Sequence, residues 1–179
     1  HAKNHSEMES MIRNHQWEAF IRKIPVKKGD FFQINPGCVH AIKGGTLILE
    51  TQQSSDITYR VYDYDRLSDG KPRQLHVEQS IATIQAPFEQ PVYDSSEEQL
   101  NGAFHSHLIT CPYYSVDRYQ IDGVFEKEFL GYFTNVSIID GEGTVNGEKI
   151  KKGMHFIIPA GSGLCRFEGK LEMICSNPE

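Results

Sequence analysis

The sequence predicts an all-β protein that is preceded by a short helical N-terminal segment, and three observations lead to this fold class. From Ile24 onward, β-branched and aromatic residues occur in short runs with the alternation of strands. Lys-Gly and Asn-Gly turns separate these runs. The order glycine, apolar run, proline, glycine occurs at residues 29–37 and again at residues 153–161, so we expect two related β-units in tandem.

The segment from Asn4 to about Lys23 has helical periodicity. Asn4 is a suitable N-cap, because Glu7 follows three residues later and can complete a capping arrangement. The apolar positions form two stripes, Met8, Met11 and Ile12 in the first and Trp17, Phe20 and Ile21 in the second. We expect the step at residues 14–16 to separate two short helices.

His40 is the first candidate site residue. Turns at residues 29–30 and 35–37 predict a strand over residues 31–34 and a new strand over residues 38–42. His40 then projects from a rigid strand beside a turn. This placement suits a metal ligand, because the direction of the imidazole is fixed before the metal arrives.

Arg60 is the second candidate. Alternation along a strand places Thr58, Arg60 and Tyr62 on one face. A guanidinium there offers a permanent charge and a planar fork to a phosphate, a carboxylate or a developing enediolate oxygen. The residues leave an alternative open, namely a structural ion pair with Glu50, Asp56 or Asp63.

The second half of the chain follows a predicted linker at residues 86–102, which is rich in Pro, Ser, Asp and Glu. In the β-unit at residues 103–179, Leu164 stands three residues after Gly161, where His40 stands three after Gly37. This unit therefore lacks the corresponding histidine, and we expect its role to be structural. His105 and His107 have ligand-like spacing, but no glutamate follows closely, so surface histidines are expected.

The turn and histidine at residues 36–40, preceded by Gly29 and an apolar run, resemble the second conserved motif of the cupin superfamily. In cupins that histidine is a metal ligand inside a small β-barrel. With GTLILETQQSSD at residues 45–56 and TYRVYDY at residues 58–64, the sequence resembles class I mannose-6-phosphate isomerase of the short bacterial type. The similarity reaches the Gln-Leu-His element at residues 74–76; it is specific over the first half of the chain and looser beyond.

The resemblance implies tandem cupin-like (jelly-roll) β-barrels. Residues 1–85 would hold the helical segment and the C-terminal part of the metal-binding cupin domain, and residues 103–179 a second, degenerate cupin-like domain. It also implies zinc-dependent interconversion of mannose 6-phosphate and fructose 6-phosphate through a cis-enediol, with His40 as a zinc ligand and Arg60 in the active site.

In the family, the other zinc ligands lie upstream of the region that starts here. A single histidine is not a zinc site, because catalytic zinc takes about three protein ligands. We therefore expect a C-terminal portion that requires the missing N-terminal half and is inactive or nearly so alone. Glu50 and Asp56 are both candidates for the general base.

Two other function classes stay open. One is a non-catalytic sugar-binding or regulatory cupin-like module, which the absence of upstream ligands favours. The other is a different metal-dependent cupin enzyme, such as an epimerase or a dioxygenase. The intact TYRVYD segment disfavours both, and a dioxygenase would need more His and carboxylate ligands.

Composition excludes other classes. A net charge of −6 argues against nucleic acid as a partner but allows a local cationic pocket for one sugar phosphate. No apolar run reaches the ~20 residues that cross a membrane, and no signal peptide is evident. The four cysteines, Cys38, Cys111, Cys165 and Cys175, lack CxxC spacing. Free thiols in a reducing, cytoplasmic compartment are expected.

Overall fold

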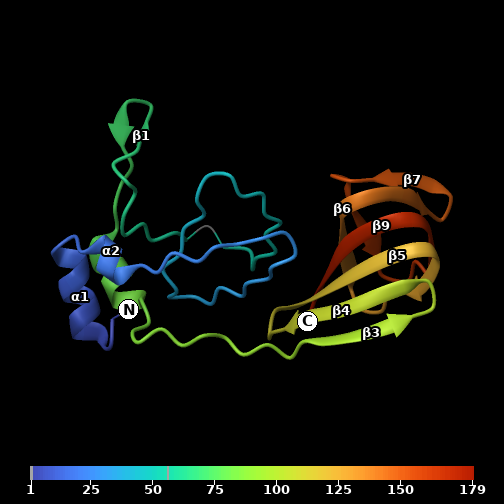
Figure 1. Cartoon of the computed structure of the whole chain (residues 1–179), viewed down its shortest axis with the longest axis horizontal. Coiled ribbons are helices and arrows are strands. Elements are labelled where there is room, and N and C mark those ends of the chain that lie inside the picture. The colour runs from blue at the N-terminus through green and yellow to red at the C-terminus, as the bar shows by residue number, and fades with distance from the viewer. Residues whose placement is uncertain (1, 56) are drawn as a thin grey trace. The chain divides into compact units, whose positions relative to one another are not determined.

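The computed structural model describes residues 2–55 and 57–179, and the chain divides into two compact units. Unit 1 comprises residues 1–50 and 54–91, and unit 2 comprises residues 51–53 and 92–179. In Figure 1, the helices belong to the first unit and the large sheet to the second. The range predicted as a linker, residues 86–102, includes the boundary at 91/92, and its residues 96–100 form a strand.

Unit 1 contains the helices α1 (His5–Arg13), α2 (Trp17–Phe20) and α3 (Val77–Thr83), and the strands β1 (Leu67–Ser68) and β2 (Lys71–Pro72). The predicted N-cap is present, since the Glu7 N–H donates to Asn4 Oδ1 at 2.9 Å. The step at residues 14–16 separates α1 from α2 as expected. Helix α3 was not anticipated from the sequence. No helix among the described residues is long and apolar enough to span a membrane.

The strands predicted around His40 and Arg60 are wrong. Residues 21–55 and 57–66 contain no helix or strand. Several apolar side chains of this stretch are open to solvent, among them Leu47, which is 94% exposed, and Ile57, which is 68% exposed. The alternating pattern alone does not make a strand, because a strand needs a neighbour to satisfy its backbone donors and acceptors.

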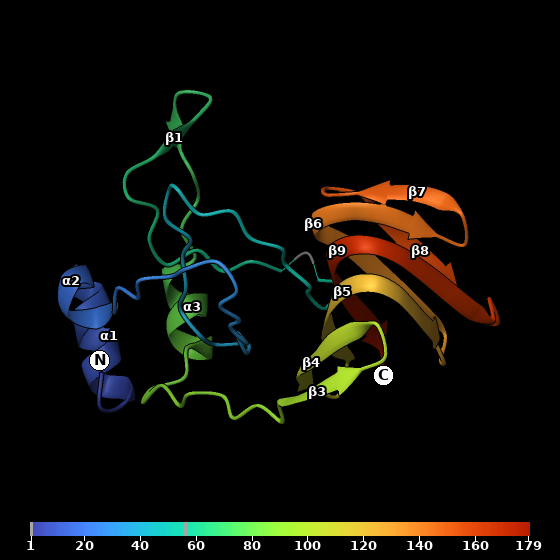
Figure 2. The same ribbon diagram turned by 45° about the vertical axis from the view of Figure 1, so that its right-hand side comes forward.

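Unit 2 is built on one antiparallel sheet of seven strands, which Figure 2 shows as a strongly curved layer. Its order is β3-β4-β5-β9-β6-β7, and β8 also pairs with β6. The bounds are β3 (Ser96–Leu100), β4 (Ala103–Thr110), β5 (Tyr114–Glu128), β6 (Phe133–Val145), β7 (Glu148–Lys151), β8 (His155–Pro159) and β9 (Leu164–Pro178). The second copy of the glycine, apolar run, proline, glycine order, at residues 153–161, does form a strand here, namely β8.

The core of unit 2 lies on one face of this sheet. Tyr119, Phe125, Phe167 and Met173 are at most 3% exposed, and the ring centroids of Tyr119 and Phe125 lie 5.3 Å apart. Removal of this apolar surface from water is the main stabilising contribution. The strands β6 and β9 approach closely, because a Cβ on Gly169 would lie 2.6 Å from the Glu142 carbonyl oxygen.

The fold class is therefore correct in outline, since the chain is mostly β-sheet with few helices. The expected tandem pair of cupin-like (jelly-roll) β-barrels is not confirmed among the described residues, because neither sheet is closed. The large sheet stays open between the edge strand β3 and the edge that carries β7 and β8, and the described residues of unit 1 form only the short pair β1 and β2. The reason is that the strand-like segments of unit 1 have no partners within the described chain.

Candidate functional site

A tight turn fixes the backbone before His40. The Cys38 N–H donates to the Asn35 carbonyl at 3.1 Å, and Gly37 has φ +81°. The Gln85 N–H donates to the Gly37 carbonyl at 3.0 Å, which attaches the turn to the end of α3. A Cβ on Gly37 would lie 2.6 Å from the Thr83 carbonyl oxygen. Both the positive φ and this close approach require glycine.

The His40 side chain is exposed, and its Nδ1 lies 2.9 Å from the Cys38 carbonyl oxygen. A carbonyl can only accept, so Nδ1 carries the proton and Nε2 presents a lone pair. Metal-binding histidines commonly donate one ring N–H to a backbone carbonyl and bind the metal through the other nitrogen. The ring is therefore suited to serve as one ligand, although it does not lie on the predicted strand.

The backbone of Arg60 is attached to the segment that begins α3. Its N–H donates to His76 Nδ1 at 3.2 Å, and the His76 N–H donates to the Arg60 carbonyl at 2.7 Å. The guanidinium makes one hydrogen bond, from Nη1 to the Gln74 carbonyl at 3.2 Å. Among the described residues it forms no ion pair, so its remaining N–H groups are available to a bound anion.

Of the predicted alternatives, an ion pair of Arg60 with Glu50 or with Asp63 is not present, and Asp56 lies outside the described residues. Asp63 instead binds Arg66, whose Nη2 lies 2.7 Å from Oδ1, and Arg73, whose Nε lies 2.7 Å from Oδ2. The hydrogen bond from Arg73, aided by that from Arg66, lowers the pKa of Asp63 to about 2. Within the segment at residues 58–64, the buried Asp63 therefore pairs with two arginines, whereas the guanidinium of Arg60 forms no ion pair with a described residue.

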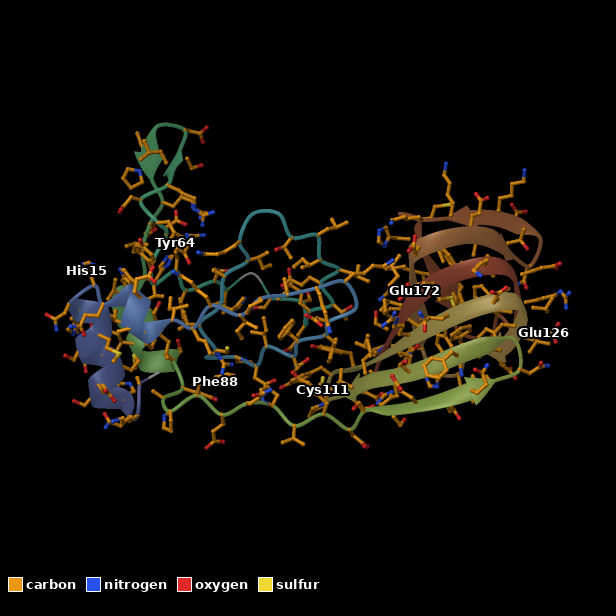
Figure 3. All side chains as sticks on the ribbon, viewed as in Figure 1. His15, Tyr64, Phe88, Cys111, Glu126 and Glu172 are labelled. Atoms are coloured by element: carbon orange, nitrogen blue, oxygen red, sulfur yellow. The ribbon has the colours of Figure 1, made fainter. Side chains whose placement is uncertain are left out.

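A small apolar core packs against the segment at residues 58–64. Val61 is buried in one cluster with Met8 and Ile12 of α1 and Ile81 of α3. The ring of Tyr62 stacks on Trp17 with centroids 4.6 Å apart and an interplanar angle of 10°. Figure 3 shows Tyr64 at the foot of the arm that ends in β1 and β2.

Within the described residues, no hydrogen bond joins His40 and Arg60. No group of three or more His, Cys, Asp or Glu side chains in the described ranges is arranged to hold a metal. Zinc takes about three protein ligands, so the described side chains do not by themselves assemble a complete zinc site. Glu50 is exposed, and Asp56, the other candidate base, lies outside the described residues.

The histidines that were expected on the surface of unit 2 are partly buried. His105 Nε2 and His107 Nδ1 lie 2.8 and 2.9 Å from Asp117 Oδ1, and His105 Nδ1 lies 2.9 Å from Glu98 Oε1. The sequence interpretation missed this group because Asp117 is ten residues from His107 along the chain. The missing signal was the hairpin register, which places Asp117 of β5 directly opposite His107 of β4.

Comparison with known proteins adds independent evidence. Residues 105–178 match the family described as mannose-6-phosphate isomerase, cupin domain. The mannose-6-phosphate isomerase ManA of Bacillus subtilis is 40% identical over 176 residues, which are 96% of this chain and 56% of that protein. The mannose-6-phosphate isomerase of Streptococcus mutans is 42% identical over 184 residues, covering 98% of this chain and 57% of that protein.

A solved structure agrees. The crystal structure of the mannose 6-phosphate isomerase from Bacillus subtilis superimposes with a TM-score of 0.94 and 38% identity, covering 98% of this chain and 58% of that one. The chain thus spans a little more than half the length of these relatives. Because the similarity extends over nearly all of its residues, the chain belongs to the mannose-6-phosphate isomerase family and carries the family's cupin domain.

Proposed function

We propose that this chain forms part of an enzyme that interconverts mannose 6-phosphate and fructose 6-phosphate. The observation that carries the proposal is the 40% identity to a mannose-6-phosphate isomerase along 96% of the chain. The geometry supports it through the open guanidinium of Arg60 and the fixed ring of His40. The four free cysteines agree with the cytoplasmic compartment that we also propose.

Arg60 would stabilise negative charge on the substrate. Isomerisation of an aldose to a ketose moves a proton between C1 and C2, and the intermediate cis-enediol carries a developing anionic oxygen. The Arg60 guanidinium has unused N–H groups that can donate to this oxygen or to the substrate phosphate. Its backbone is held at both N–H and carbonyl by His76, so the side chain starts from a fixed point.

Zinc is part of the proposal, with His40 as one ligand through Nε2. When bound, the zinc ion would supply an electrophile for the substrate oxygens. No group of three or more His, Cys, Asp or Glu side chains among the described residues is arranged to hold a metal, and catalytic zinc takes about three protein ligands, so the proposal includes further ligands from another segment. The hydrogen bond from Nδ1 to the Cys38 carbonyl supports the assignment, because it fixes the tautomer that leaves Nε2 free.

The further zinc ligands would come from a segment equivalent to the part of the relatives that this chain does not span. The exposed apolar residues of unit 1 support this idea. Ile42, Leu47 and Ile57 are 55%, 94% and 68% exposed, and they lie in a stretch without strand partners. Such a surface is typical of one that another polypeptide covers. The same backbone path occurs in a crystal structure of which this chain covers 58%.

The test is reconstitution. The 179-residue chain would be mixed, or co-expressed, with the part of the Bacillus subtilis relative that it does not span, and isomerase activity and zinc content measured. We expect no turnover from either piece alone and zinc-dependent turnover from the pair. The control is the pair with His40→Asn, which should retain association but lose bound zinc.

Two outcomes would contradict the proposal. Turnover by the 179-residue chain alone would show that the site is complete without a partner segment. Association of the two pieces with zinc bound but no turnover on mannose 6-phosphate would favour a sugar-binding or regulatory module instead.

A further inference from the structure

Unit 2 contains a cavity of about 280 Å³ that the proposed isomerase site does not use. It opens over β4, β5 and β9, and its lining includes His105, Asp117, Tyr119, Lys127, Glu128 and Phe129. The volume lies near the lower end of the roughly 300–1,000 Å³ that is typical of small-molecule sites.

The hydroxyl of Tyr119 has no hydrogen-bond partner in the described part of the chain. This is unusual, because Tyr119 is only 2% exposed and buried tyrosine hydroxyls normally find a partner. Its ring is fixed by stacking on His105, with centroids 4.6 Å apart and an interplanar angle of 8°. Tyr119 is itself one of the residues that line the cavity.

Lys127 supplies a cation to the same cavity. Its Nζ lies 5.7 Å from the ring centroid of Tyr119 and 5.6 Å from that of Phe129. These contacts between cation and ring hold the ammonium in place. No carboxylate within the described ranges pairs with it, so its three N–H donors are available to a ligand.

The acceptors come from two carboxylates. Asp117 uses Oδ1 to bind the rings of His105 and His107, and its second oxygen has no side-chain partner among the residues described. Glu128 also lines the cavity, and its carboxylate makes no side-chain hydrogen bond to the described residues. The cavity thus presents an ammonium donor, a phenol and carboxylate oxygens around one aromatic wall.

We propose that this cavity binds a neutral polyhydroxylated molecule of the size of one monosaccharide. Hydroxyl groups can donate to Asp117 and Glu128 and accept from Lys127 and Tyr119, so one such ligand satisfies both kinds of group. Its C–H face would pack on Phe129. A phosphorylated sugar fits less well, because its phosphate would lie beside two carboxylates and only one ammonium.

The test is a titration of the ¹⁵N-labelled 179-residue chain with D-mannose and D-fructose, followed by amide chemical shifts. We expect saturable shifts confined to residues 105–107, 117–119, 127–129 and 175–177, with dissociation constants on the order of millimolar. Parallel titrations use mannose 6-phosphate, inorganic phosphate and glycine. Tighter binding of any of these at the same residues would overturn the choice of a neutral polyol.

Three variants assign the contacts. Tyr119→Phe keeps the stacked ring and should weaken binding about two- to tenfold, whereas Lys127→Met should weaken it at least about tenfold. The matched control is Lys170→Met, because Lys170 is exposed and pairs with Asp122 at 2.8 Å. Absence of saturable shifts up to the solubility of the sugars, or equal losses in the control, would refute the site. A spectrum that keeps its dispersion excludes misfolding as the cause of any loss.

Discussion

Arg60 and His76 hold each other through a reciprocal pair of hydrogen bonds. The Arg60 N–H donates to His76 Nδ1 at 3.2 Å, and the His76 N–H donates to the Arg60 carbonyl at 2.7 Å. Because His76 immediately precedes α3, this pair joins the TYRVYD segment to the helix that also receives the turn before His40. The backbones that carry the two candidate residues are thus attached to opposite ends of one helix.

Replacement of His76 should loosen this attachment. His76→Ala removes the acceptor of the Arg60 N–H, and we expect a loss of about 0.5–1.5 kcal/mol in unfolding free energy. Trp17, the one tryptophan of the chain, belongs to unit 1 and reports its unfolding by fluorescence. Hydrogen exchange at the Arg60 amide should accelerate. In the control His155→Ala, a histidine of unit 2 that bonds Ser137, the Trp17 transition should not move.

Arg60→Lys keeps the positive charge but removes the planar set of N–H donors, so it tests the geometry of the guanidinium. In the reconstituted enzyme we expect at least a ~100-fold lower kcat/KM, as for loss of a donor to a developing anion. Stability should change by no more than about 0.5 kcal/mol, because the backbone bonds to His76 remain. Arg166→Lys is the matched control, since Arg166 pairs on the surface of unit 2 with Glu126 at 3.0 Å. Full activity of the Arg60→Lys variant would remove Arg60 from the proposed site.

Gly37→Ala tests the turn that precedes His40. Gly37 and Gly45 both have positive φ, at +81° and +85°, but only Gly37 faces a backbone oxygen, that of Thr83. The positive φ should cost each alanine variant about 1–2 kcal/mol. Gly37→Ala should cost at least about 1 kcal/mol more than Gly45→Ala, because the clash adds to the strain. Equal denaturation midpoints for the two alanine variants, measured by Trp17 fluorescence, would show that packing of the turn against the end of α3 does not contribute to stability.

Asp63 gives unit 1 a defined response to acid. The hydrogen bond from Arg73 lowers its pKa to about 2, below the roughly 3.9 of an unfolded aspartate. The ionised group therefore stabilises the fold fully above about pH 4, and this contribution is lost as pH falls from about 4 to about 2. In Asp63→Asn the stability of unit 1 should be lower at pH 7 and should decline less over that acid range.

Denaturation monitored by Trp17 fluorescence at a series of pH values provides the measurement. Asp65→Asn is the neighbouring control, because Asp65 is exposed and forms no ion pair among the described residues. That variant should follow the parent protein across the range. An unchanged acid profile for Asp63→Asn would mean that the two arginines do not stabilise the folded state through Asp63.

Local signals in the sequence were sufficient for several elements. The cap at Asn4 and the break at residues 14–16 depend on residues adjacent in the chain, and both are present. The glycine and proline boundaries also predict the strand at residues 155–159, which forms because it pairs with β6. The same pattern at residues 29–37 yields no strand, because no neighbouring strand is described beside it. Helix α3 lacked a recognisable cap and was missed.

The sequence by itself determined the family, the β-rich composition of the fold, and the two candidate residues His40 and Arg60. These conclusions depend on motifs whose members are close in the chain. The tertiary structure decided which groups meet: Asp63 with two arginines, Arg60 with His76, and Asp117 with His105 and His107. The physical reason is that strand register and helix docking bring distant residues within hydrogen-bond distance, and the linear pattern does not encode that distance directly.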